Sequence, residues 1–189
     1  TAVNVGLEET EPTLRKALAI GADDAIRVNT EPFDAFFVAK QIAEVFLKGS
    51  YDFIVCGKES IDYNGGQLGE MIAELLQIPS VTSASFLELD GNRAKLEREI
   101  DGGKEKLELD FPFVASAGKG FAIEPRIPSM RGIMASRKKP LDVFEPVSAD
   151  ILTKPVKYYL PQAKTACKFI DPENVEELIQ LLHTEAKVI

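Results

Sequence analysis

The residues best suited to chemistry lie in one segment, Cys56 to Gly69, which reads CGKESIDYNGGQLG. It joins a predicted buried strand, Asp52 to Cys56, to a helical pattern. In open α/β sheets, ligands bind at this carboxyl edge of the strands. Gly65 and Gly66 carry no side chain to keep a phosphate from the backbone, and the helix start offers free amide groups and a positive dipole end. The segment therefore predicts an anion-binding loop.

The loop pattern does not identify the ligand, because it matches neither the Walker phosphate loop nor the dinucleotide fingerprint. Lys58 is either a phosphate partner or an ordinary solvated lysine. Asp62 or Asn64 either caps the following helix or contacts a ligand. A nucleophilic Ser60 lacks a base, because the single histidine, His183, is remote in sequence and lies in a predicted helix.

No catalytic or metal-binding set can be assembled from the remaining residues. The two cysteines, Cys56 and Cys167, have no metal-ligand spacing, and we expect both to be buried thiols. Three carboxylates alternate with basic residues, which is typical of a charged sheet face rather than of paired acid–base catalysis. They are Glu97, Glu99 and Asp101, beside Lys95 and Arg98. We therefore expect no catalytic residue and no metal site.

Composition bounds the class of protein. The chain has 189 residues, 45% hydrophobic and 28% charged, which is ordinary for a globular protein with one core. Its net charge of -8 argues against a partner with a phosphate backbone. No apolar run approaches the roughly 20 residues that span a bilayer, and no leader precedes the first strand pattern, so we expect a soluble intracellular protein.

The first part of the chain alternates strand and helix patterns. Strands are predicted at Thr1 to Val5, Ala25 to Val28 and Asp52 to Cys56. Helices are predicted from Glu11 to Ile20, over a stripe ending at Gly49, and over a stripe containing Met71, Ile72, Leu75 and Leu76. Successive βα units imply a doubly wound, mostly parallel sheet covered by helices.

After Pro79 the pattern changes to an antiparallel meander. Segments Ser85 to Leu89, Arg93 to Glu99 and Glu105 to Leu109 alternate polar and apolar residues, and Asp90-Gly91 and Gly102-Gly103 separate them as hairpin turns. Phe113 to Ala117 is predicted to return to the main sheet. The segment Gly118 to Pro140 is then an exposed loop with a short basic run.

The last part of the chain is predicted to be an extended arm ending in a helix. Glu145 to Pro161 contains three prolines and no clean period, and Asp171 is predicted to cap a helix with Pro172 at its first position. We therefore divide the chain into an α/β domain, 1–145, and an arm with a helix, 146–189, that lies on another surface.

Three spaced segments together resemble the β subunit of the electron transfer flavoproteins. They are Cys56 to Met71, the run LEREIDGG from Leu96 to Gly103, and the loop Glu124-Pro125-Arg126 leading to Gly132-Ile133-Met134 and Arg137-Lys138-Lys139. The order and spacing match over nearly the whole chain.

The resemblance implies an adenine nucleotide alpha-hydrolase-like fold and a nucleotide bound in the glycine loop. The nucleotide is AMP or, in electron-bifurcating members, a second FAD. Gln67 matches the family's loop glutamine, whereas Tyr63, Gly66 and Leu68 depart from the common AMP pattern. The residues it places around the nucleotide are Val5, Gly57, Lys58, Glu59, Ser60, Ile61, Asp62, Tyr63, Asn64, Gly65, Gly66, Gln67 and Leu68.

The resemblance also implies partners. An α subunit holds the redox FAD, and the pair carries electrons from dehydrogenases, such as acyl-CoA dehydrogenases of fatty acid oxidation, to a membrane quinone oxidoreductase, in the bacterial cytoplasm or the mitochondrial matrix. Segment Gly118 to Pro140 is similar to the family's recognition loop. Met130 falls where the family has an apolar anchor, and Arg126 is a candidate conformational switch. The loop's other predicted contact residues are Ile133, Met134, Arg137 and Lys138.

Two further expectations concern the start of the chain and its function class. The family pattern has another strand, loop and helix before the segment that matches Thr1, so we expect the α/β domain to be incomplete at its N-terminal side. The alternative function is a stand-alone ATP-binding stress-type module that forms homodimers. The predicted arm disfavours this alternative.

Overall fold

The computed structural model describes residues 1–164 and 167–188, in two compact units. The first unit runs from Thr1 to Lys154 and contains both sheets. The second runs from Pro155 onward and contains helix α5 (Val175–Leu181). Residues 146–154 therefore belong to the first compact unit. The division into a nucleotide-binding domain, 1–145, and an arm that packs on a partner, 146–189, stays a prediction.

The first sheet has three parallel strands in the order β1-β2-β8. These strands are β1 (Ala2–Val5), β2 (Ala25–Val28) and β8 (Leu141–Phe144). All four residues of β2 are buried, because this strand is central and helix α1 (Glu11–Ile20) covers it through Leu14 and Leu18. A short 3-10 turn, Glu8–Thr10, links β1 to α1.

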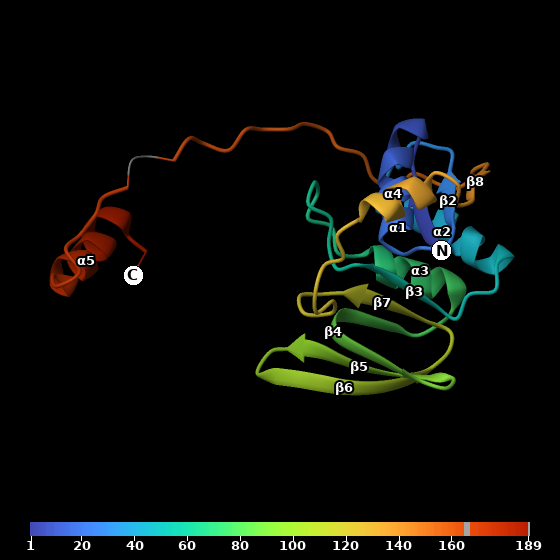
Figure 1. Cartoon of the computed structure of the whole chain (residues 1–189). Helices are drawn as coiled ribbons and strands as arrows, with labels where there is room; N and C mark the ends of the chain where they lie inside the picture. Colours follow the sequence, from blue (N-terminus) through green and yellow to red (C-terminus); the bar gives the residue numbers. More distant parts are fainter. Residues whose placement is uncertain (165–166, 189) are drawn as a thin grey trace. The chain divides into compact units, whose positions relative to one another are not determined.

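The second sheet has five strands in the order β3-β7-β4-β5-β6. Strands β3 (Phe53–Gly57), β7 (Phe113–Ala117) and the start of β4 (Ser80–Asp90) pair in parallel. Strands β4, β5 (Arg93–Ile100) and β6 (Gly103–Asp110) form the predicted antiparallel meander, on the side of the sheet away from helices α1 and α4 in Figure 1. Its turns use Gly91 and Gly102, whose φ angles of 60° and 86° suit glycine.

Two helices join the sheets into one unit. Helix α2 (Ala35–Lys48) packs against β1, and helix α3 (Leu68–Leu76) packs against β3 and β7. The helices also pack against each other, where Ala39 shares a buried cluster with Ile72 and Val114. The small side chain of Ala39 lets the two helix axes approach closely.

The α/β class is confirmed, but the strands form two sheets rather than one. Among the described residues, β1 ends one sheet and β3 ends the other, and no hydrogen-bonded ladder joins them. Strand β8 was not predicted, because four residues between Pro140 and Glu145 show only one hydrophobic alternation. It forms because β2 supplies a parallel edge, to which Leu141 through Phe144 pair in register.

The predicted start of the last helix is wrong. Helix α5 begins after Asn174, whose side chain accepts a hydrogen bond from the Glu177 amide and donates one to the Glu177 carboxylate. Asp171 instead closes a turn by accepting from the Glu173 amide. Asparagine caps as well as aspartate does, and the reciprocal Glu177 contact decides between the two candidates.

The core under the second sheet depends on one aromatic side chain. Phe113 is fully buried and stacks on Phe53 at 5.2 Å between ring centroids. Phe111 adds a second ring at 5.9 Å.

We expect Phe113→Ala to lower the free energy of unfolding by ~3–5 kcal/mol, because it leaves a cavity beneath the meander. Phe169→Ala, at a side chain that is 92% exposed, is the matched control and should leave that free energy within ~0.5 kcal/mol. Urea denaturation followed by circular dichroism measures both. Similar midpoints for the two variants would contradict this assignment of the core.

Candidate functional site

The glycine loop lies at the carboxyl end of the parallel strands, as predicted. It begins at Gly57, the last residue of β3, and ends where α3 starts at Leu68. The Lys58 amide donates to the Ala117 carbonyl at 3.1 Å, so the loop starts beside the end of β7. All residues from Gly57 to Gln67 are exposed, and the loop projects away from β3 and α3 in Figure 1. Its own side chains therefore do not fill the edge of the sheet.

Backbone geometry explains the two loop glycines differently. The Ser60 amide donates to the Gly65 carbonyl at 3.0 Å and closes the loop. A Cβ on Gly66 would lie 3.0 Å from the Lys58 carbonyl oxygen, so this glycine allows the two limbs to approach. A Cβ on Gly65 would have its nearest neighbour, the Ser60 hydroxyl, at 3.9 Å. Gly65 thus leaves room on the outside of the loop rather than within it.

The start of helix α3 offers amide groups without a side-chain cap. Its N-cap residue is Gln67, and no side chain accepts from the first turn. The suggestion that Asp62 or Asn64 caps this helix is therefore wrong, since both lie farther back in the loop. Asn64 instead adopts a left-handed turn conformation with φ of 53°. Uncapped amides at a helix N-terminus are suited to an anion.

A third glycine, Gly69, brings α3 against the strand ends. A Cβ there would lie 2.5 Å from the Ser116 hydroxyl and 3.0 Å from the Cys56 sulfur, so any other residue would push the helix away. Gly69 belongs to the predicted segment Cys56 to Gly69 but was not among the predicted site residues. A glycine one position inside a helical pattern was the signal that could have found it.

Cys56, Ser116 and Glu70 form a small polar cluster under the helix start. Burial raises the pKa of the Cys56 thiol, the Ser116 hydroxyl opposes this, and the Glu70 charge adds to it. The thiol is therefore protonated and unreactive at neutral pH. Glu70 accepts from the Ser116 hydroxyl at 3.4 Å through one oxygen, while its other oxygen is buried without a hydrogen-bond partner. Cys167, in contrast, is exposed, which corrects the expectation that both thiols are buried.

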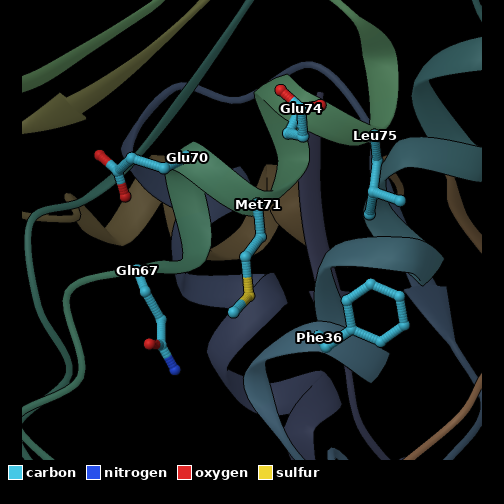
Figure 2. A pocket seen from close by; sticks show the side chains of 6 residues that line it. All are labelled: Phe36, Gln67, Glu70, Met71, Glu74 and Leu75. Carbon is cyan, nitrogen blue, oxygen red and sulfur yellow. The ribbon is translucent and has the colours of Figure 1, made fainter. Parts of the chain in front are cut away.

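An apolar groove of about 310 Å³ runs beside the loop's last residue (Figure 2). Phe36 of α2 and Met71 and Leu75 of α3 face one another there, and Gln67 also lines the groove. In Figure 2 the Glu70 side chain extends to the side opposite Leu75. The groove joins the glycine loop to the α2–α3 contact.

Val5 and its neighbours form the corresponding edge of the other sheet. Val5 itself is buried against Ile26 and Val28. The Arg27 side chain is only 5% exposed and donates to the Gly6 carbonyl, the Asn29 side chain and Glu11. Among the contacts that the structure describes, Arg27 therefore holds the end of β1 in place. An arginine inside the apolar strand AIRV was the sequence signal for this role.

Most of the predicted recognition segment is exposed, and it contains helix α4 (Met130–Ser136). Ser129 caps the helix by accepting from the Gly132 amide at 3.1 Å. Arg126 donates to the Ile20 carbonyl at the end of α1, at 3.5 Å. The large apolar side chains exposed here are Ile123, Ile127, Met130, Ile133 and Met134, and the exposed basic ones include Arg137 and Lys138.

Helices α1 and α4 cap each other's carboxyl ends. Lys139 donates through Nζ to the Leu18 and Ala22 carbonyls at the end of α1. Arg15 of α1 donates to the Ser136 and Lys139 carbonyls at 2.8 and 2.7 Å. Gly132 lies so close to α1 that a Cβ would come within 2.4 Å of the Ala19 carbonyl oxygen. We call Arg15, Gly132 and Lys139 the α1–α4 latch.

The described residues contain neither a metal-ligand cluster nor a membrane-spanning helix. Within 1–164 and 167–188 there is no group of three or more histidine, cysteine, aspartate or glutamate residues placed to hold a metal ion. No helix in those ranges has the length and apolarity to cross a membrane.

Fold and site together define an α/β protein with an open glycine loop at the end of its parallel strands. A family model for the electron transfer flavoprotein domain matches residues 1–149. The chain belongs to the electron transfer flavoprotein family.

Among its relatives are proteins named electron transfer flavoprotein subunit beta from three organisms. The Bacillus subtilis protein is 37% identical over 203 aligned residues, covering 100% of this chain and 79% of the relative. The Homo sapiens protein is 35% identical over 190 residues, covering 96% and 73%. The Syntrophomonas wolfei protein is 34% identical over 172 residues, covering 90% and 68%.

If the α1–α4 latch holds helix α4, substituting Lys139 should loosen the helix, whereas substituting the neighbouring Lys138 should not. We expect Lys139→Met to speed amide exchange in Met130–Ser136 about tenfold, equivalent to ~1.4 kcal/mol, because two carbonyls of α1 lose their donor. Lys138→Met, at an exposed side chain, should leave the exchange rates unchanged. Hydrogen exchange with mass spectrometry measures both variants. Equal exchange in the two would contradict the latch.

Proposed function

We propose that this chain is the β-type subunit of an electron transfer flavoprotein and works with an FAD-bearing α subunit. In this proposal the pair accepts electrons from dehydrogenases, such as acyl-CoA dehydrogenases, and passes them to a membrane quinone oxidoreductase. It does so in the cytoplasm of a bacterium or in a mitochondrial matrix. Family membership and the names of the relatives support the subunit role. The chain's own part is binding and docking rather than bond-making catalysis.

The observation that carries the proposal is the open glycine loop beside an uncapped helix. Residues 57–67 are exposed at the strand ends, and the amides of α3's first turn have no side-chain cap. Ile61 is entirely exposed within that loop, which is unfavourable for an apolar side chain until something covers it. A nucleotide such as AMP, or the adenylate half of FAD, supplies both the anion and an apolar ring.

Two acceptor atoms also fit a nucleotide rather than a bare phosphate. Asn4 Oδ1, in strand β1, and Glu70 Oε2, in the first turn of α3, are buried without hydrogen-bond partners. Both atoms can accept a hydrogen bond, and an adenosine moiety carries donors in its ribose hydroxyls and its amino group. When bound, the nucleotide stabilises the loop by placing negative charge at the helix dipole.

The recognition segment supports docking by an electron-transfer partner. Met130 and Met134 are 76% and 68% exposed on a helix that the latch holds in place. Exposed methionines make adaptable apolar contacts, which suits a surface that meets several dehydrogenases. Arg126, exposed beside the end of α1, is proposed to change partner as the flavin domain moves.

The second unit is proposed to pack on the α subunit. Leu160 and Phe169 are 95% and 92% exposed, and α5 leaves Leu178 and Ile179 about half exposed. Exposed apolar side chains of this density mark an interaction surface. The exposed apolar side chains of this unit would thus be buried in the heterodimer.

The nucleotide proposal predicts the effect of a side chain at Gly65. We expect Gly65→Val in the heterodimer to lower nucleotide occupancy tenfold or more, because the new side chain projects from the outside of the loop without an internal clash. Gly103→Val, where a Cβ meets nothing within 4 Å, is the control. Mass spectrometry of the released nucleotide identifies AMP or FAD and gives its amount. Normal occupancy in Gly65→Val would remove this loop as the site, and ATP in a homodimer would favour the stress-type module.

The docking proposal predicts the effect of removing the methionine anchor. We expect Met130→Ala to slow reduction of the heterodimer by a partner dehydrogenase about tenfold, since a central apolar anchor contributes ~1–2 kcal/mol to docking. Flavin content should not change, which absorbance of the purified complex checks. Phe86→Ala, at a side chain 43% exposed on the meander, is the control. Unchanged reduction rates for Met130→Ala would defeat this surface assignment.

A further inference from the structure

Helix α2 holds the chain that leaves strand β8. After Phe144 the backbone runs back along α2. It contacts the side chain of Gln41, within the helix, and that of Asp34, the N-cap residue. We call residues 145–154 the strap. The strap contains no helix or strand, so side-chain contacts with α2 decide whether it has a fixed path.

The first contact is a two-way pairing of Gln41 with the Val147 backbone. The Gln41 amide nitrogen donates to the Val147 carbonyl at 2.9 Å, and the Val147 amide donates to the Gln41 oxygen at 2.8 Å. Gln41 is only 2% exposed. A buried amide whose two functional atoms both serve one peptide unit fixes that unit closely, because either bond lost leaves a buried polar group unpaired.

The second contact is the Asp34 carboxylate, which has two separate tasks. One oxygen accepts from the Phe37 amide at 2.8 Å and caps α2. The other accepts from the Leu152 and Thr153 amides at 2.6 and 2.7 Å, and from the Thr153 hydroxyl at 3.4 Å. Burial raises the pKa of Asp34, but the hydrogen bonds from Phe37, Thr153 and Leu152 outweigh this and lower it overall, so the carboxylate is charged at neutral pH.

The spacing of the two contacts gives the strap a direction. Asp34 and Gln41 are seven positions apart, which is two helical turns and about 10 Å on one face of α2. Because Val147 meets Gln41 while Thr153 meets Asp34, the strap runs antiparallel to the helix. The second contact falls directly before Pro155, where the second unit begins.

We propose that Asp34 and Gln41 are positioning residues for subunit assembly, which clamp the strap so that the arm beyond Lys154 starts from a fixed point on the surface. This inference rests on the proposed function, in which the arm binds the FAD-bearing subunit. A fixed start confines the arm's exposed apolar side chains to a smaller volume and lowers the entropy lost on association. The clamp thus acts on assembly without touching flavin or nucleotide.

The chain offers variants that separate the clamp from the helix cap. Asp34→Asn keeps one oxygen to accept from the Phe37 amide but presents an NH₂ group to the Leu152 and Thr153 amides, so donors face donors. Gln41→Met keeps the length of the side chain and removes both polar atoms. Asp150→Asn, at an exposed carboxylate of the strap, is the matched control.

The first measurement is amide exchange in the full chain. We expect Asp34→Asn to speed exchange at Leu152 and Thr153, and Gln41→Met at Val147, by about tenfold, while exchange at Phe37 stays within twofold of the parent because the cap is kept. Asp150→Asn should match the parent throughout. Unchanged exchange at these amides in the two clamp variants would overturn the clamp itself.

The second measurement is association with the FAD-bearing subunit. We expect both clamp variants to raise the Kd about five- to tenfold, mainly through a slower association rate, with normal flavin absorbance once the complex has formed. Altered exchange together with an unchanged Kd would overturn the role in assembly. If the parent chain fails to associate at all, the proposed function fails and this role fails with it, whereas the exchange data still decide whether the clamp exists.

Discussion

The packing of helix α2 is the constraint on which the rest of the first unit depends. Its buried residues serve two cores, since Ala39 packs with Ile72 of α3 while Val45 packs with Val5 of β1. The two sheets share no hydrogen-bonded ladder, so side-chain packing of α2 and α3 joins them. Apolar burial over a whole helix face supplies this kind of stability without directional bonds. The relative position of the two strand edges is therefore set by helix packing.

That dependence explains where glycine and small residues occur near the candidate site. Gly69 allows α3 to lie against Cys56 and Ser116, and Gly132 allows α4 to lie against Ala19. In both places a larger residue would shift a helix that carries exposed functional groups at its end. Gly65 and Gly66 serve another purpose, because they lie in a loop that is exposed along its length. Close helix packing thus fixes the position of the glycine loop, and the loop itself stays exposed and accessible to a ligand.

The parts of the fold that are visible in the sequence are those with strong local periodicity. The helix Glu11–Ile20 and the strand Ala25–Val28 match the predicted ranges, and the meander follows from alternating residues and its two glycine turns. Strand β8 was missed because four residues give little periodicity and because its partner, β2, lies more than a hundred positions earlier. The start of α5 was misplaced because aspartate, proline and asparagine within four positions all resemble a helix start.

In the candidate site, too, the features set by neighbouring residues could be predicted from the sequence, whereas those set by distant residues could not. The glycine loop is contiguous, so its position after β3 could be predicted from sequence spacing alone. The basic run Arg137-Lys138-Lys139 looks uniform in sequence, yet Lys139 is bound to carbonyls 117 and 121 positions away while its two neighbours are exposed. Nothing local distinguishes an ammonium that caps a distant helix from one in solvent.

The difference between the bound Lys139 and the exposed Arg137 and Lys138 also affects how the recognition segment would bind a partner. The chain carries a net charge of -8, and the exposed Arg131, Arg137 and Lys138 place three basic side chains on and directly after α4. Such a local charge guides the approach of a partner and is screened by salt, whereas the methionines beside it contribute contact area that salt leaves largely unchanged. Arg15 and Lys139 donate to carbonyls at the helix ends, so they fix the position of α4 and add little to the outward charge of the recognition segment. Different residues therefore orient this surface and attract a partner: Arg15 and Lys139 hold α4 in place, whereas Arg131, Arg137 and Lys138 carry the outward charge.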